Sequence, residues 1–306
     1  MSIVVEGLTK KYGEQKAVND ISFEIKTGEV VGFLGPNGAG KSTTMKMITC
    51  FMAPTDGDVR LDDLSIHSEQ EAIKRKIGYL PENNPLYADM AIIDYLRFSA
   101  EIQGVEKTQI AGRISEMIEK CGLDREKHKN INELSKGYRQ RVGLAQAMIH
   151  DPEVLILDEP TTGLDPNQIV EIRKLIKELG KQKTVILSSH ILSEVEATCD
   201  RILIINRGRI VADGSSDTLR QQAQGQELLT VQIEGEGDVN RALLGLASVE
   251  KAMPIDGREG FYSVQSKPES SSRKAIFDLC VAQKWYLLEM TGIETRLEDV
   301  FRDLTN

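Results

Sequence analysis

The sequence predicts an α/β domain built on a parallel β-sheet, followed by a smaller α+β domain. Two short runs, residues 154–158 and 184–188, are almost wholly apolar, which is the pattern of strands buried on both faces of a parallel sheet. The helical pattern at 166–179 between them indicates a right-handed strand-helix-strand unit. From about residue 221 the composition becomes polar and glutamine-rich, as is typical of a linker, so a second domain is expected at 221–306.

The first domain, residues 1–220, is expected to contain one all-helical block. Residues 92–150 show no strand pattern and read as consecutive helices, so we interpret them as a helical insert in the α/β domain. The other expected elements of this domain either precede the insert or are the helices that form it. They are strands at 3–8, 18–25 and 29–34, a helix at 41–51, and insert helices at 92–102, 108–120 and 135–149.

The second domain is expected to adopt a small ferredoxin-like α+β fold. Its first six elements follow the strand-helix-strand-strand-helix-strand order of that fold. No set of residues with catalytic chemistry occurs here and the acidic residues are scattered, so the domain is either a solvated accessory domain or a dimerisation or regulatory domain. The expected elements are strands at 228–233, 249–253, 260–264 and 285–290 and helices at 239–246, 271–282 and 296–304.

Composition excludes several classes of protein. The 306 residues carry 47 Asp and Glu against 38 Lys and Arg, a net charge of −9, which argues against binding nucleic acid or anionic lipid over a broad basic surface. No apolar run approaches the ~20 residues of a membrane-spanning helix, and the N-terminal segment lacks the layout of a signal peptide, so a cytosolic location is expected. The four cysteines and four histidines do not cluster, so a zinc site is not expected.

One segment matches the phosphate-binding pattern G-x-x-x-x-G-K-[ST]. Glycines allow successive backbone N–H groups to point at one anion, and the helix that begins near Lys41 adds its N-terminal dipole. Lys41 is expected to reach the β- and γ-phosphates, and the Ser42 hydroxyl can bind Mg²⁺. A glycine-rich turn without a ligand is the alternative, but the segment lies between an apolar strand and a helix, as the pattern requires. The expected phosphate-binding residues are Gly35, Pro36, Asn37, Gly38, Ala39, Gly40, Lys41, Ser42 and Thr43.

Two carboxylates, Asp158 and Glu159, lie at the carboxyl end of a buried strand. Ligands of open α/β sheets bind at that edge. Asp158 can hold the Mg²⁺ that Ser42 also contacts, and Glu159 can act as a general base or orient an attacking water. The alternative for Glu159 is a solvated acid at a strand end, and the neighbouring phosphate-binding loop makes that interpretation the weaker one.

Two longer motifs resemble those of ABC-transporter ATPases. Residues 134–140, Leu-Ser-Lys-Gly-Tyr-Arg-Gln, open a helix before the carboxylate strand and look like the family's signature motif. Residues 161–165, Thr-Thr-Gly-Leu-Asp, follow Glu159 and resemble its D-loop. The resemblance implies that Ser135 and Gly137 bind the γ-phosphate of ATP held by another subunit.

Three single residues complete this resemblance. His190 is similar to the family's switch histidine, which contacts the γ-phosphate, and Tyr12 to its adenine-stacking aromatic residue. Glu82 occupies the Q-loop position, where a metal contact is expected. Taken alone, His190 would more often be a structural histidine, Tyr12 an exposed surface tyrosine and Glu82 an exposed loop acid. Together the motifs follow the family's order over about residues 1–220.

The sequence departs from the family's commonest pattern at three positions. Lys136 and Tyr138 replace the usual Gly and Gln of the signature, and this version resembles the branch that serves exporters of drugs, polysaccharides or lipids and gliding-motility systems. Glu82 replaces the usual Gln of the Q-loop, which adds a negative charge near the expected Mg²⁺. Ser135 and Gly137 are kept, so phosphate binding is still expected.

The resemblance implies an ATPase with ATP and Mg²⁺ as ligands. Two copies would close head to tail on ATP and part after hydrolysis, with Glu159, His190 and Lys41 as catalytic residues. A separate integral membrane permease would receive the motion near Glu82 and the helical insert, which would place the protein at the cytoplasmic face of the inner membrane. Two alternatives stay open: a soluble ABC-type ATPase with a mechanical role elsewhere, and a regulatory module that binds ATP without useful hydrolysis.

Overall fold

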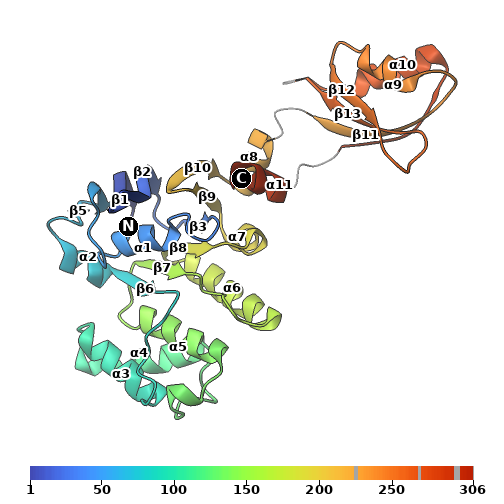
Figure 1. Ribbon diagram of the computed structural model, residues 1–306. Coiled ribbons are helices and arrows are strands. Elements are labelled where there is room, and N and C mark those ends of the chain that lie inside the picture. Colours follow the sequence, from blue (N-terminus) through green and yellow to red (C-terminus); the bar gives the residue numbers. More distant parts are fainter. Residues whose placement is uncertain (224–226, 268–269, 293–296, 306) are drawn as a thin grey trace. The chain divides into compact units, whose positions relative to one another are not determined.

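The structure of the protein, a computed structural model, describes residues 1–223, 227–267, 270–292 and 297–305 (Figure 1). The chain forms two compact units. The first comprises Met1–Ser216 together with the end of the chain from Leu304, and the second comprises Asp217–Asp303. No helix among the described residues is both long and apolar enough to cross a membrane.

The first unit contains a largely parallel sheet, six-stranded within the described residues, with the order β10-β9-β3-β8-β7-β6. Only β10 runs antiparallel to its neighbour. Strands β3, β7 and β8 are buried along their whole length, which confirms the prediction of buried strands made from the apolar runs at 154–158 and 184–188. The strands are β3 (Val30–Leu34), β6 (Ile77–Leu80), β7 (Val154–Asp158), β8 (Thr184–Ser189), β9 (Arg201–Asn206) and β10 (Arg209–Gly214).

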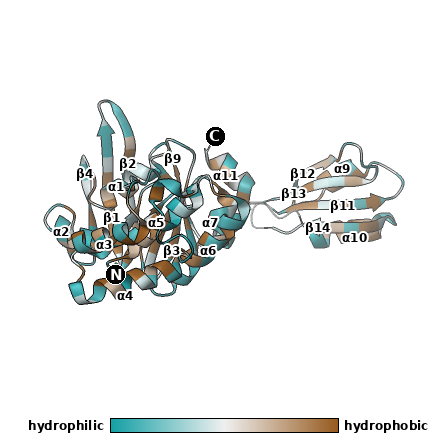
Figure 2. Cartoon of the chain, turned by 90° about the horizontal axis from the view of Figure 1, so that it is seen from below, coloured by the Kyte–Doolittle hydropathy of each residue, from teal (hydrophilic) through white to brown (hydrophobic). Residues whose placement is uncertain are grey.

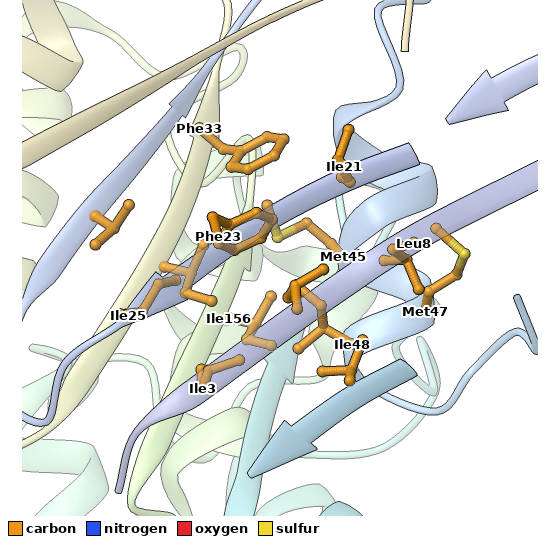
Figure 3. Packing of buried hydrophobic residues seen from close by; sticks show 14 of the residues in the cluster. Ile3, Leu8, Ile21, Phe23, Ile25, Phe33, Met45, Met47, Ile48 and Ile156 are labelled. Atoms are coloured by element: carbon orange, nitrogen blue, oxygen red, sulfur yellow. The ribbon is translucent and has the colours of Figure 1, made fainter. Parts of the chain in front are cut away.

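A second, antiparallel sheet with the order β2-β1-β4-β5 lies in the same unit. Helix α1 (Lys41–Ile48) contributes Met45, Met47 and Ile48 to one core that also contains residues of both sheets (Figure 3). The rings of Phe23 and Phe33, one from each sheet, lie 5.6 Å apart in that core. The strands are β1 (Ile3–Tyr12), β2 (Gln15–Ile25), β4 (Asp56–Leu61) and β5 (Leu64–Ser65).

The predicted helical insert is present as three helices that pack on one another (Figure 1). In α3 and α4, buried apolar residues recur at helical spacing between exposed polar residues. Hydrophobic and hydrophilic residues alternate along the helices of this unit (Figure 2). The helices of the unit are α2 (Gln70–Lys76), α3 (Ile92–Ile102), α4 (Lys107–Lys120), α5 (Lys136–Met148), α6 (Pro166–Gly180) and α7 (Leu192–Thr198), with a 3-10 turn at Ile131–Glu133.

Several elements differ from the sequence prediction. Helix α1 ends at Ile48 and not at residue 51, because Cys50 adopts a left-handed backbone conformation with φ of 55°. Strand β1 continues to Tyr12 and joins β2 in a hairpin. Strands β4, β5, β6, β9 and β10 and helices α2 and α7 were not predicted; β4, for example, buries only Val59 and Leu61 completely, too few apolar residues for a strand pattern.

The second unit contains an antiparallel sheet with the order β12-β13-β11-β14. Helices α9 and α10 follow β11 and β13, so the described elements occur in the predicted order. Its core consists of buried residues from α9, α10, β11, β12 and β13, and partly buried residues of β14 pack against it. The elements are β11 (Leu228–Glu234), α9 (Val239–Leu244), β12 (Val249–Pro254), β13 (Phe261–Ser266), α10 (Arg273–Gln283), β14 (Tyr286–Gly292) and the greater part of α11 (Leu297–Thr305), which ends in the first unit.

The first residues of the predicted linker, 221–223, are helical in the structure. Residues 221–223 end helix α8 (Ser216–Ala223) and are not irregular. Gln224, Gly225 and Gln226, the rest of the predicted linker, lie outside the described residues, as does Arg296 at the start of the predicted last helix.

Candidate nucleotide-binding site

The phosphate-binding loop connects β3 to α1, and two of its glycines are required by their surroundings. Gly40 has φ of 111°, a conformation that L side chains rarely adopt, and a Cβ added to it would lie 2.5 Å from the carbonyl oxygen of Ala17. A Cβ added to Gly35 would lie 2.3 Å from the carbonyl oxygen of Ile205. The loop is therefore held against β2 and β9 at contact distances that only glycine permits.

The backbone N–H groups of this loop are suited to an anion. The N–H of Ala39 donates to Pro36 O and that of Thr44 donates to Gly40 O. Within the part of the chain that the structure describes, the other backbone N–H groups of residues 37–43 have no protein acceptor, and the α1 dipole reinforces their positive potential. These free amides belong to Asn37, Gly38, Gly40, Lys41, Ser42 and Thr43.

Lys41 is buried and its ammonium group already faces the loop. Nζ donates to Gly35 O at 2.7 Å and to Pro36 O at 3.3 Å. Nζ also lies 3.5 Å from Glu159 Oε1, and both side chains are less than a tenth exposed. A cation held by carbonyl oxygens and one carboxylate can exchange these contacts for phosphate oxygens with little movement of the backbone.

Oxygen ligands for a divalent cation converge where β7 ends. Ser42 Oγ, on α1, donates to Asp158 Oδ1 at 3.1 Å. Ser188 Oγ, from the neighbouring strand β8, donates to the same oxygen at 2.5 Å. A hydroxyl and a buried carboxylate are ligands that Mg²⁺ accepts, so the residues present fit this ion. The sequence-predicted Glu82 is exposed and lines the same cavity as Ser42 and Asp158.

Glu159 sits in a strained but well-held conformation. Its φ is 50°, which is uncommon for a residue with a side chain. Its N–H donates to Ser188 Oγ at 3.0 Å, and its Oε2 accepts from Thr162 Oγ1 at 3.3 Å. His190 Nδ1 lies 2.9 Å from the same oxygen. The turn after β7 thus places the carboxylate within reach of Lys41 and His190.

The sequence did not single out two residues that contribute to this corner. Ser188 bonds both carboxylate residues, and its register opposite Asp158 in parallel strands is the signal that could have identified it. Tyr79, on β6, has a buried hydroxyl with no partner among the described residues. Burial raises the pKa of Tyr79, and the charges of Asp158 and Glu82 raise it further.

A cavity of about 850 Å³ extends from this corner to the helical insert. Ser42 and Asp158 line one part of it, and Tyr95, Gln146 and His150 of the insert line another. Burial lowers the pKa of His150, which favours the neutral ring. The cavity therefore connects the candidate metal ligands with the insert through the segment that contains Glu82.

The remaining predicted residues do not join this cluster. Tyr12 ends β1, its ring is half exposed, and its hydroxyl donates to Met52 Sδ at 3.0 Å. Ser135 is exposed and caps α5 by accepting from the N–H of Tyr138 at 3.4 Å. Gly137 is buried in the first turn of α5. None of the contacts described for Ser135 or Gly137 within residues 1–223 reaches the phosphate-binding loop of the same chain.

The arrangement combines an anion cradle, a buried cation, two candidate Mg²⁺ ligands and a second carboxylate beside a histidine. Phosphoryl transfer to water needs these groups, because its transition state carries charge on the phosphoryl oxygens and the attacking water must be oriented. The site therefore has the chemistry of nucleotide hydrolysis.

Comparisons with known proteins agree with this chemistry. The family model described as ABC transporter matches residues 18–162. An uncharacterised ABC transporter ATP-binding protein of Bacillus subtilis is 36% identical over 98% of this chain and 95% of its own length. The Nod factor export ATP-binding protein I of Paraburkholderia xenovorans is 32% identical over 99% of this chain and 97% of its own. The bacitracin transport ATP-binding protein of Bacillus licheniformis is 39% identical over 72% of this chain and 73% of its own.

Solved structures match the larger part of the chain. An ATP-binding subunit of an ABC transporter has a TM-score of 0.67 and 32% identity, covering 73% of this chain and 93% of its own. A dimeric ATP-binding cassette in a post-hydrolysis state with ADP and phosphate has a TM-score of 0.65 and 27% identity, covering 70% of this chain and 98% of its own.

Proposed function

The chain belongs to the ABC transporter family as an ATP-binding subunit, and from that premise we propose that two copies close on ATP to drive an exporter. It binds ATP and hydrolyses it to ADP and phosphate to energise transport. The single observation that carries the proposal is the convergence of Lys41, Ser42, Asp158, Glu159 and His190 in one corner of the sheet.

Each residue of that corner has a proposed role. Lys41 and the free loop amides bind the β- and γ-phosphates, and Tyr12 stacks on the adenine. Ser42 and Asp158, with Glu82 in the same cavity, would hold Mg²⁺, which would neutralise charge on the phosphate oxygens. Glu159 accepts the proton of the attacking water, and its bond to His190 keeps the carboxylate oriented. His190 is 42% exposed, so its ring is free to contact the γ-phosphate from the open side.

The signature residues act in the second copy's site under this proposal. The chain offers two helix N-termini to phosphate, at Lys41 and at Ser135, but the described contacts do not bring them together. Head-to-tail pairing of two chains would place Ser135 and Gly137 of one copy on the γ-phosphate held by the other. The similarity to a cassette solved as a dimer with ADP and phosphate supports this arrangement.

Export is the proposed direction of transport. The relative named for Nod factor export supports this direction, and the relative named for bacitracin transport supports a transport role. The cavity that joins Ser42 and Asp158 to the insert through Glu82 is the proposed contact with a separate membrane permease. The chain would then lie at the cytoplasmic face of the membrane.

Copurification tests the transport role. A tagged chain purified from detergent-solubilised membranes should bring down a polytopic membrane protein, and the complex should hydrolyse ATP several-fold faster than the isolated chain. Glu82→Ala, at the rim of the cavity, should weaken the stimulation more than ATP binding. Recovery of the chain only with ribosomes or other soluble partners would contradict a transporter subunit.

The second unit is proposed to be a ferredoxin-like domain that strengthens dimerisation. Its antiparallel sheet, with the order β12-β13-β11-β14 and one helix after each of β11 and β13, supports the fold. Truncation after Arg220 should raise the protein concentration needed for the ATP-bound dimer about tenfold, as measured by sizing. The truncation also removes the bond from Asn206 Nδ2 to Leu304 O, so Asn206→Ala is the control. Unchanged dimerisation would assign the unit another role.

A further inference from the structure

Two helices, α5 and α6, meet at a contact that the roles above do not use. Gly137 is buried although Ser135 and Lys136 before it are exposed. What covers it is the side chain of Gln168, on the first turn of α6: a Cβ added to Gly137 would lie 2.1 Å from Gln168 Oε1 and 2.6 Å from its Cδ. Gly137 thus allows the Gln168 carboxamide to rest directly on the backbone of α5.

Further contacts between the same segments lie on either side of this one. One turn along each helix, Arg141 pairs with Glu171, and Arg141 also donates to Cys121 O at 3.1 Å. Before α6 begins, a Cβ added to Gly163 would lie 2.1 Å from Lys136 Nζ, so the Lys136 side chain lies over Gly163. Contacts at successive turns fix both the rotation and the register of α5 relative to α6.

The segment that precedes Gln168 connects it to Glu159 in the candidate nucleotide-binding site. Asp165 Oδ1 accepts from the N–H groups of Asn167 and Gln168 at 3.0 Å and so caps α6. At the other end of the same short segment, Thr162 bonds the carboxylate of Glu159. The chain from Glu159 to Gln168 is therefore tied to the candidate base at one end and to α5 at the other.

We propose that Gln168 is a positioning residue: its carboxamide, packed on Gly137, sets the orientation in which α5 presents Ser135 to a second copy. The inference rests on the proposed function, because that presentation matters only in a dimer. It also gives Gly137 a role within its own chain, as the site where Gln168 can approach closely. A change in the position of the Glu159 side chain would be passed to α5 through the contact between Gln168 and Gly137.

The test compares Gln168→Ala with Asn167→Ala, its exposed neighbour, in the full-length chain. Gly137→Ala and the double variant Gly137→Ala/Gln168→Ala complete a double-mutant cycle. Nucleotide affinity is measured on the monomer, and the ATP concentration for half-maximal dimerisation is measured in the Glu159→Gln background. Because a Gln side chain can swing aside, Gly137→Ala should displace it and not unfold the chain.

The expected result separates positioning from general damage. Gln168→Ala should raise the ATP concentration for dimerisation about fivefold. Gly137→Ala should raise it at least as much, because it also changes the contact with the γ-phosphate, and the double variant should raise it no further than Gly137→Ala. Monomer affinity for ATP should stay within about twofold, and Asn167→Ala should behave as the parent. A Gln168→Ala dimer indistinguishable from that of Asn167→Ala, or losses that multiply in the double variant, would overturn the proposal.

Hydrogen exchange keeps this test independent of dimerisation. In the nucleotide-free chain, peptides covering the start of α5 should exchange several-fold faster in Gln168→Ala than in Asn167→Ala. If the parent never dimerised with ATP, the proposed function would fail, while faster exchange would still show that Gln168 orders α5. Unchanged exchange would overturn the positioning role in either case.

Discussion

Glu159→Gln is expected to stop steady-state ATP hydrolysis while ATP binding is retained. The amide keeps the volume of the side chain and can still bond Thr162 and His190, but it cannot accept a proton from water. General-base catalysis typically contributes 10²–10⁴-fold, so turnover should fall by about that factor. Phosphate release and equilibrium binding of a fluorescent ATP analogue measure the two properties separately.

The matched control for this variant is Glu153→Gln. Glu153 precedes β7 in the same segment, is exposed and pairs with Lys76 at 2.8 Å. It should hydrolyse ATP as the parent does and have the same affinity for nucleotide. A Glu159→Gln chain that turned over ATP at the parent rate would show that another group accepts the proton.

Lys41→Ala is expected to remove most of the affinity for ATP. The buried ammonium group is the one cation that the structure places against the loop carbonyls within residues 35–43, and it is free to exchange them for phosphate oxygens. Hydrogen bonds to charged groups contribute about 1.5–3 kcal/mol each, so losing two at the lower figure costs about 3 kcal/mol. That loss corresponds to roughly a hundredfold in the dissociation constant, measurable by calorimetry.

Folding must be checked in this variant because Glu159 loses its pair with Lys41. The carboxylate keeps Thr162 and His190 as partners, so the Tm should fall by only a few degrees. Lys120→Ala, on α4, removes a cation of the same kind outside both the loop and the cavity and should bind ATP as the parent does. Normal ATP affinity in Lys41→Ala would contradict the assignment of the loop.

Local patterns predicted the centre of this site because its geometry follows from short stretches of sequence. An apolar strand such as β7 ends where its carboxylates begin, and a glycine loop between strand and helix needs no distant residue to be recognised. The insert helices were predictable for the same reason, since their apolar residues recur at helical spacing.

Contacts between distant segments could not be predicted in this way. Ser188 is one polar residue at the end of a strand until β8 is placed beside β7. Nothing in the sequence distinguishes Gln168 from other residues in the first turn of a helix, and its contact with Gly137 is seen only in the structure. Tyr79 lies in an apolar strand, and no sequence pattern indicates that its hydroxyl is buried without a partner among the described residues. Such roles depend on tertiary packing, which a single sequence does not encode locally.

The central claim is that two chains close around ATP to form the complete site. Light scattering on the Glu159→Gln chain, at a protein concentration where the nucleotide-free sample is monomeric, tests it most directly. With ATP the mass should rise from the 34.0 kDa of one chain to twice that value, and Ser135→Arg should prevent the rise without loss of ATP binding. A mass that stayed at 34.0 kDa with ATP bound would contradict the account.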